Sequence, residues 1–96
     1  MRVKIFPKAT NDIAYIYAYL CEAYSMRLAD EKVAQVYADI DLLAEHPFMG
    51  KSIDGHDQNF RQFYSNPNVI IYDINDQVLE ILHIVDARMD YVRLLV

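Results

Sequence analysis

Two stretches in the first half of the chain repeat their apolar residues at steps of three and four positions, which is the period of one helix face. In residues 9–24 the repeating positions are Ile13, Ile16, Tyr17, Leu20 and Tyr24. A second stretch follows Ser25, a residue type that caps helix N-termini, and runs to Leu43, before Pro47. The pattern predicts two helices. Because only a few residues join them, we expect an antiparallel helix hairpin.

Other segments are typical of strands, because they alternate polar and apolar residues or are rich in Val, Ile, Tyr and Phe. The four predicted strands are residues 2–6, 60–64, 69–74 and 78–87. The last of them carries apolar residues at both odd and even positions, as Leu79 and Leu82 illustrate. We therefore expect this strand to be covered on both faces for part of its length.

The connections between these segments decide the predicted architecture. Residues 65–68 and 75–76 are short runs of turn-forming types, whereas residues 51–59 are polar, contain a glycine and predict a loop. Three consecutive strands with short connections predict an antiparallel meander, which the helix hairpin covers on one face. We therefore expect one α+β domain over residues 1–96, in the order strand, helix, helix, strand, strand, strand, with the hairpin packed on an antiparallel sheet.

Composition narrows the classes of function. The chain has 96 residues, 54% of them apolar, with 9 Lys+Arg against 14 Asp+Glu and a net charge of −5. A surface that holds several phosphates is normally basic, so this balance argues against direct DNA binding. One cysteine and three scattered histidines predict neither a disulfide nor a metal site, and no cofactor is expected. With no bilayer-length apolar stretch and no signal peptide pattern, a cytoplasmic protein without membrane contact is expected.

Several short motifs occur in a characteristic order along the chain. They are Asn11-Asp12-Ile13, residues 16–20 (IYAYL), residues 46–50 (HPFMG), Phe60-Arg61, residues 69–74 (VIIYDI) and residues 84–90 (IVDARMD). In this order and spacing, over nearly the whole chain, the sequence resembles the RelE/ParE toxin superfamily of bacterial toxin–antitoxin modules. The resemblance implies one fold but two biochemical branches, and a shared fold does not choose between them.

RelE-like members cut mRNA on the ribosome, and for that branch the resemblance implies phosphate binding by Arg61 and Arg88 and proton transfer by His83 or Tyr91. ParE-like members inhibit DNA gyrase. This sequence has Asp86 where the family often has a histidine, and Met89 where an arginine or glutamine is common. Both departures remove groups that RNA cleavage uses, so we favour a ParE-like toxin that binds DNA gyrase and is neutralised by a cognate antitoxin. The alternatives are a ribosome-dependent endoribonuclease, with ribosome and mRNA as partners, and a non-toxic interaction module.

The residues expected to contact a protein partner are either exposed side chains or apolar residues at the C-terminal end of the chain. They are Tyr15, Tyr19, Arg61, Arg88, Leu94 and Leu95. Tyr15 and Tyr19 are four positions apart and lie off the apolar stripe of their helix, so they can form an exposed aromatic pair. The structural alternative is that these tyrosines only flank the core and that each arginine pairs with an acidic neighbour, which for Arg88 is Asp86. For His83 the alternative is a partly buried, neutral, hydrogen-bonded side chain.

Overall fold

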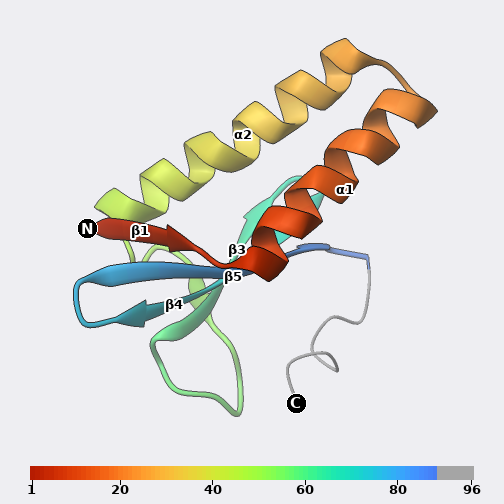
Figure 1. Ribbon diagram of the computed structural model, residues 1–96. Helices are drawn as coiled ribbons and strands as arrows, with labels where there is room; N and C mark the ends of the chain where they lie inside the picture. The colour runs from red at the N-terminus through yellow and green to blue at the C-terminus, as the bar shows by residue number, and fades with distance from the viewer. Residues whose placement is uncertain (89–96) are drawn as a thin grey trace.

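Two helices lie across one face of a five-stranded sheet in the computed structural model, which describes residues 1–88 (Figure 1). The elements follow one another as β1 (Arg2–Ile5), α1 (Pro7–Ala23), α2 (Met26–Glu45), β2 (Lys51–Ser52), β3 (Phe60–Ser65), β4 (Asn68–Asn75) and β5 (Val78–Asp86). The α+β class and the predicted order of helices and main strands are confirmed.

The helix boundaries follow from local chemistry. Pro7 occupies the first turn of α1, where an amide hydrogen would have no intrahelical partner. The hydroxyl of Ser25 accepts a hydrogen bond from the Leu28 N–H at 3.1 Å and so caps α2. At the other end α2 stops at His46, directly before Pro47. The hairpin is further tied by the Tyr17 hydroxyl, which donates to Asp30 Oδ1 at 3.0 Å.

The sheet differs from the predicted antiparallel meander at both edges. Its strand order is β1-β5-β4-β3-β2, and β1 pairs with β5 in parallel, so the sheet is mixed. At the opposite edge, Lys51 and Ser52 form a two-residue strand paired with Gln62 and Arg61. The expected loop over residues 51–59 was therefore wrong at its start. Both residues are exposed and are held in the sheet by backbone pairing. Their side chains therefore show no apolar pattern that would predict a strand.

A β-bulge explains why β5 is apolar at both parities. Ile71 pairs with His83 and Tyr72 pairs with Ile81, which leaves Leu82 as the extra residue of β5. A bulge shifts the following side chains to the other face. The side chains of β5 thus face the helices at Ile81 and again at Ile84, although these positions have opposite parity.

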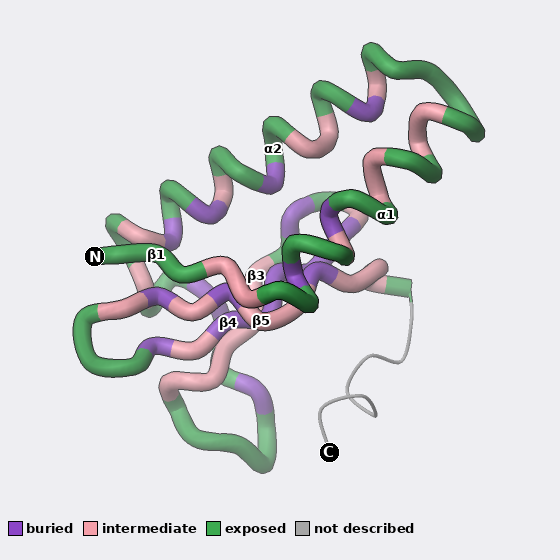
Figure 2. Tube along the Cα trace, viewed as in Figure 1, coloured by how far each residue is buried: buried purple, intermediate pink, exposed green. Residues whose placement is uncertain are grey.

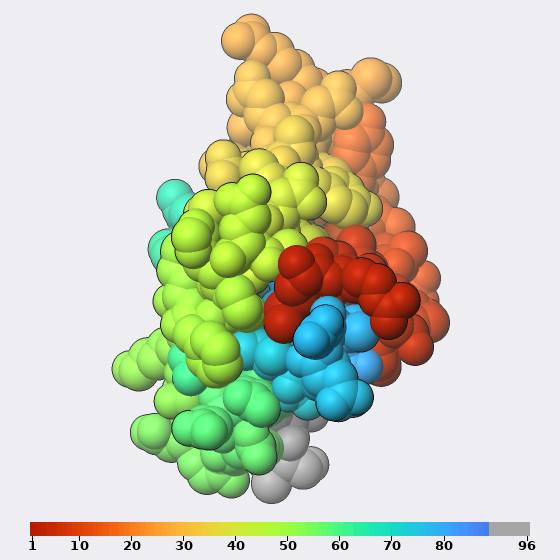
Figure 3. Space-filling model, turned by 90° about the vertical axis from the view of Figure 1, so that its left-hand side faces the viewer, coloured from red at the N-terminus to blue at the C-terminus, as the bar shows by residue number. Residues whose placement is uncertain are grey.

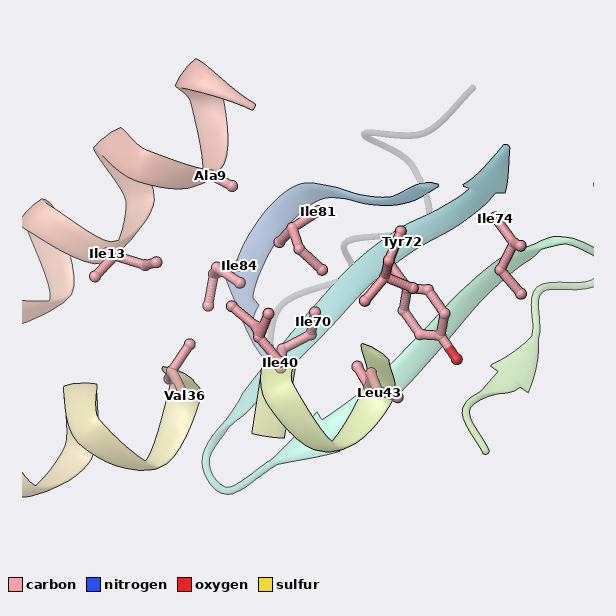
Figure 4. Packing of buried hydrophobic residues seen from close by; sticks show 11 residues of the cluster. Ala9, Ile13, Val36, Ile40, Leu43, Ile70, Tyr72, Ile74, Ile81 and Ile84 are labelled. Atoms are coloured by element: carbon pink, nitrogen blue, oxygen red, sulfur yellow. The ribbon is translucent and has the colours of Figure 1, made fainter. Parts of the chain in front are cut away.

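The main core lies between the sheet and the helices, and a smaller cluster covers part of the other sheet face. The core joins Ala9 and Ile13 of α1, the inner face of α2, and β4 and β5 (Figures 2 and 4). The smaller cluster consists of buried Ile53, Val69 and Ile71, with Val85 packed against it. The expectation that part of β5 is covered on both faces is therefore confirmed. Within residues 1–88, neither helix is apolar enough over its length to cross a membrane.

Candidate interaction surface on the first helix

Two tyrosines of α1 and a third directly after it are exposed to solvent. Tyr15 is 74% exposed, Tyr19 is 54% exposed, and Tyr24, which follows the last turn, is 66% exposed. Tyr15 and Tyr19 are one turn apart, so they lie on the same helix face. In contrast, Ile13 of the same helix is buried in the core. The predicted exposure of the pair Tyr15 and Tyr19 is confirmed.

Arg88 lies just past the end of β5 and is held there by Asp86. Its Nε donates to Asp86 Oδ1 at 2.9 Å and its Nη2 donates to Asp86 Oδ2 at 2.5 Å. The backbone N–H of Arg88 donates to Asp86 Oδ1 as well, at 2.8 Å. These hydrogen bonds lower the pKa of Asp86 to about 2 and raise the pKa of Arg88. The ion pair with Asp86, which was the structural alternative considered for Arg88, is present, and Arg88 follows the strand and does not close it.

Arg88 follows a strand, β5, that packs on α1. After the larger effect of Asp86, the side chains of Tyr19 and Tyr24 contribute to the raised pKa of Arg88. The helix that carries Tyr19 and the strand that precedes Arg88 lie side by side, although the two residues are 69 positions apart in the sequence. We call Tyr15, Tyr19, Tyr24 and Arg88 the tyrosine–arginine surface.

Asp12 fixes the end of β5 against α1. One of its oxygens, Oδ2, accepts a hydrogen bond from the backbone N–H of Ile84 at 3.0 Å, and the other pairs with Lys8 on the same helix. β1 ends at Ile5, opposite Ile81, so the amide of Ile84 has no strand partner on that side. The carboxylate satisfies this N–H. It thereby anchors the segment that carries Arg88 beside the helix that carries the tyrosines.

Arg61, the other predicted arginine, has a different position and role. Its Nη1 donates to the carbonyl oxygens of Gly50 at 2.7 Å and Phe48 at 3.4 Å, and its guanidinium lies 4.8 Å from the centre of the Phe48 ring. No acidic side chain within residues 1–88 forms an ion pair with it. The acidic partner considered for Arg61 is therefore wrong. Two backbone carbonyls and an aromatic ring bind this half-buried cation instead.

The same turn is held by a buried tyrosine that sequence reasoning treated only as a strand residue. The Tyr72 hydroxyl donates to the Pro47 carbonyl at 2.7 Å and accepts from the Gly50 N–H at 3.0 Å. Burial is the main cause of the raised pKa of Tyr72. Figure 4 shows its ring among the core side chains, with the hydroxyl at the end of the cluster. The HPFMG motif was the available signal, since a Pro-x-x-Gly turn needs partners for its backbone groups.

Two of the candidate catalytic residues, Arg61 and His83, are not brought together. Directly paired residues on neighbouring strands point to the same sheet face. Arg61 pairs with Tyr72, a core residue, so its side chain lies on the helix side. His83 pairs with Ile71, which belongs to the cluster on the other face. The sheet therefore separates Arg61 from the half-buried His83.

The sheet face that carries His83 also bears two carboxylates. Asp73 of β4 and Glu80 of β5 are direct cross-strand partners, and Lys4 of β1 is the partner of Glu80 on the other side. This row therefore has two anionic groups and one cationic group. The two neighbouring carboxylates repel each other, and their negative charge also repels a polyanion such as RNA.

The comparisons with known proteins agree with this architecture. A family model described as the ParE toxin of the type II toxin–antitoxin system parDE matches residues 3–91. The chain belongs to the ParE toxin family. A solved structure of the chromosomal ParDE toxin–antitoxin system from P. aeruginosa contains a chain with a similar fold, with a TM-score of 0.77 at 18% identity. That likeness covers 90% of this chain and 95% of the other. A comparison with curated proteins finds no match.

Family membership confirms the resemblance inferred from the motifs and assigns the chain to the ParE-like branch. Among the residues considered for function, Tyr91, Leu94 and Leu95 lie outside the described residues. Within residues 1–88, no three His, Cys, Asp or Glu side chains gather closely enough to hold a metal ion. For this ParE family member, the described residues of the predicted partner contact are Tyr15, Tyr19, Arg61 and Arg88.

Proposed function

We propose that this ParE family member is a cytoplasmic toxin that acts by binding a protein, that its target is DNA gyrase, and that a cognate antitoxin neutralises it. The single observation that carries the proposal is the distribution of the candidate residues. Tyr15, Tyr19 and Arg88 are exposed on α1 and just past the end of β5, the strand packed against α1, whereas Arg61 and His83 lie on opposite faces of the sheet. The first arrangement suits a contact with a protein, and the second does not suit cleavage of RNA.

RNA cleavage at a 2′-hydroxyl needs a base, an acid and cationic groups around one phosphate. In the described residues the guanidinium of Arg61 is bound to carbonyl oxygens and that of Arg88 to Asp86. His83 shares its sheet face with Asp73 and Glu80, whose charges oppose a polyanion. These contacts support a mechanism in which the toxin occupies a surface of its target and makes or breaks no bond.

The tyrosine–arginine surface has the features of a protein contact. Tyrosine and arginine are enriched among the residues that dominate binding energy, because each offers a large contact area and hydrogen-bonding groups. Arg88 is held by two side-chain hydrogen bonds to Asp86, so little of its conformational freedom remains to be lost on binding. Tyr15 and Tyr19 are on a helix backbone, which fixes the spacing of their rings.

Neutralisation by an antitoxin is expected to use exposed apolar side chains. Besides the tyrosines, Phe48 is 60% exposed and Met49 is 42% exposed, and both lie on the turn that Arg61 and Tyr72 hold. An antitoxin segment that folds on binding can cover such side chains over a long path. The structure from P. aeruginosa is described as a toxin–antitoxin system, and this description supports a cognate antitoxin for the present chain.

The test is to induce the chain alone and together with the adjacent gene, and to measure plasmid supercoiling and protein synthesis in the same cultures. We expect supercoiling to fall while protein synthesis continues, and co-expression of the antitoxin to reverse the effect. Codon-dependent mRNA ends found by primer extension, with supercoiling unchanged, would support the endoribonuclease instead. Normal growth on induction of the chain alone would support the non-toxic interaction module.

A further inference from the structure

A hollow of about 380 Å³ lies between α2 and the end of β3. Lys32, Gln35 and Asp39 line it from the helix, and residues 63–66 line it from the strand and the following turn. In Figure 3 the turn between β3 and β4 protrudes beside α2. This hollow is separate from the tyrosine–arginine surface, which is built on α1 and the end of β5.

The strand beside this hollow has an open edge. On one side β3 pairs with β4 over its whole length, from Phe60 to Ser65. On the other side β2 covers only Arg61 and Gln62. Within residues 1–88, no strand pairs with Phe63, Tyr64 or Ser65 on that outer side. An open edge presents backbone donors and acceptors to an extended segment of another chain.

Two polar groups of the hollow lack a partner within the described residues. The Ser65 Oγ is buried without a hydrogen bond, in a residue that is only 4% exposed. The ammonium of half-buried Lys32 forms none of the ion pairs or hydrogen bonds found there. Among the other polar lining groups, Gln35 donates to Asp39 and Tyr64 donates to Asn66. Asp39 keeps its negative charge, so the hollow has one carboxylate of its own besides the Lys32 ammonium. Both unpaired groups can donate a hydrogen bond, so they call for an acceptor.

From these contacts we infer a peptide-binding groove that takes an extended segment of a partner protein. The segment is added as a strand to β3 at residues 63–65. One Asp or Glu side chain of the segment lies in the hollow, beside Lys32 and Ser65. The open edge selects an extended backbone as the occupant. The unpaired ammonium selects a carboxylate, which also accepts from the Ser65 hydroxyl. Phe63 packs on the core, so the groove has a fixed wall. The inference does not depend on which protein the toxin targets.

The test uses the full, isotope-labelled chain and three blocked peptides of seven residues, followed by NMR. The first peptide alternates threonine and valine with a central glutamate, the second has glutamine in its place, and the third keeps the glutamate but carries N-methyl groups on its central amides. We expect the first peptide to shift the amide signals of Lys32 and residues 63–65. It should bind about tenfold more tightly than the glutamine peptide, because it forms a charge-assisted hydrogen bond. The N-methylated peptide should not bind, because it cannot pair with the strand edge.

Two lysine variants complete the experiment. Lys32→Gln should bind the glutamate peptide no better than the glutamine peptide, whereas Lys4→Gln, altered at the opposite edge of the sheet, should bind like the unaltered chain. Equal binding of the first two peptides, or equal binding by both lysine variants, would overturn the charge selection. Failure of the glutamate peptide to shift residues 63–65, or the same shifts with acetate alone at equal concentration, would overturn the peptide groove.

Discussion

The hydroxyl of Tyr72 and the backbone of Gly50 are in such close contact that no side chain fits at position 50. The hydroxyl accepts the Gly50 N–H at 3.0 Å, and a Cβ added to Gly50 would overlap the hydroxyl and lie 2.7 Å from the Gln62 carbonyl oxygen. The guanidinium of Arg61 donates a hydrogen bond to the Gly50 carbonyl oxygen. The helical layer is therefore joined to the sheet by a turn whose backbone groups are bound by two side chains of β3 and β4.

Replacing Gly50 by alanine should destabilise the fold by about 3 kcal/mol or more, because the new Cβ meets a backbone oxygen and a buried hydroxyl that cannot move away cheaply. Gly55 is the matched control. It has a φ of +83° but open space around it, so alanine there should cost only about 1 kcal/mol, from backbone strain. Urea unfolding of both variants measures the difference. Equal losses would mean that the close contact at Gly50 is not a constraint.

Tyr72→Phe removes the hydroxyl and leaves the Gly50 N–H without its buried acceptor. We expect a loss of about 1–3 kcal/mol in the free energy of unfolding, which is the usual cost of an unsatisfied buried donor. Tyr37→Phe is the control, because Tyr37 is 43% exposed on α2. Denaturant unfolding of the two variants gives the comparison. Similar stability of the two variants would contradict the structural role given to the Tyr72 hydroxyl.

The helices and the main strands could be predicted from the sequence because their patterns are local. The stripe through Ile13 and Leu20 and the cap at Ser25 need no information from elsewhere in the chain. The parallel pairing of β1 with β5 was not predicted, because it joins segments more than seventy residues apart. The strand Lys51–Ser52 was missed because backbone pairing alone forms it. The bulge at Leu82 was visible only as apolar residues at both parities.

In the candidate site, too, the local features could be predicted from the sequence and the contacts between distant segments could not. The exposure of Tyr15 and Tyr19 follows from the helix period, and the pairing of Asp86 with Arg88 follows from their proximity in the sequence. That the end of β5 lies beside α1 depends on contacts across the fold, among them the hydrogen bond from the Ile84 amide to Asp12. The binding of Arg61 to carbonyl oxygens could not be inferred, since any nearby acceptor would satisfy a guanidinium.

The pair Asp86 and Arg88 predicts a specific acid titration. Because Arg88 lowers the pKa of Asp86 from 3.8 to about 2, the pair contributes to stability above about pH 4, and this contribution is lost as the pH falls through the folded-state pKa. Carboxyl NMR signals should show Asp86 titrating near pH 2. In Arg88→Ala the midpoint should return toward the ordinary value. An unchanged midpoint in that variant would exclude Arg88 as the cause.

The hydrogen bond between Tyr17 and Asp30 predicts an alkaline titration. Chiefly through this hydrogen bond, the pKa of Tyr17 is raised from 10 to about 12. Since the folded-state pKa is the higher one, the contact stabilises the hairpin below pH 10 and ceases to do so as the pH rises through 12. Ultraviolet titration of Asp30→Asn should show one tyrosine ionising at lower pH than in the unaltered chain. Identical titration curves for the two proteins would show that Asp30 does not raise the pKa of Tyr17.

The most direct test of the proposed mechanism is the inhibition of purified DNA gyrase by the purified chain in a supercoiling assay. We expect the unaltered chain, His83→Ala and the control Tyr37→Ala to inhibit equally. The double variant Tyr15→Ala, Tyr19→Ala should need about tenfold more protein, because truncating aromatic contact residues removes a large share of binding energy. Absence of inhibition by the unaltered chain, together with mRNA cleavage that His83→Ala abolishes, would contradict action by protein binding.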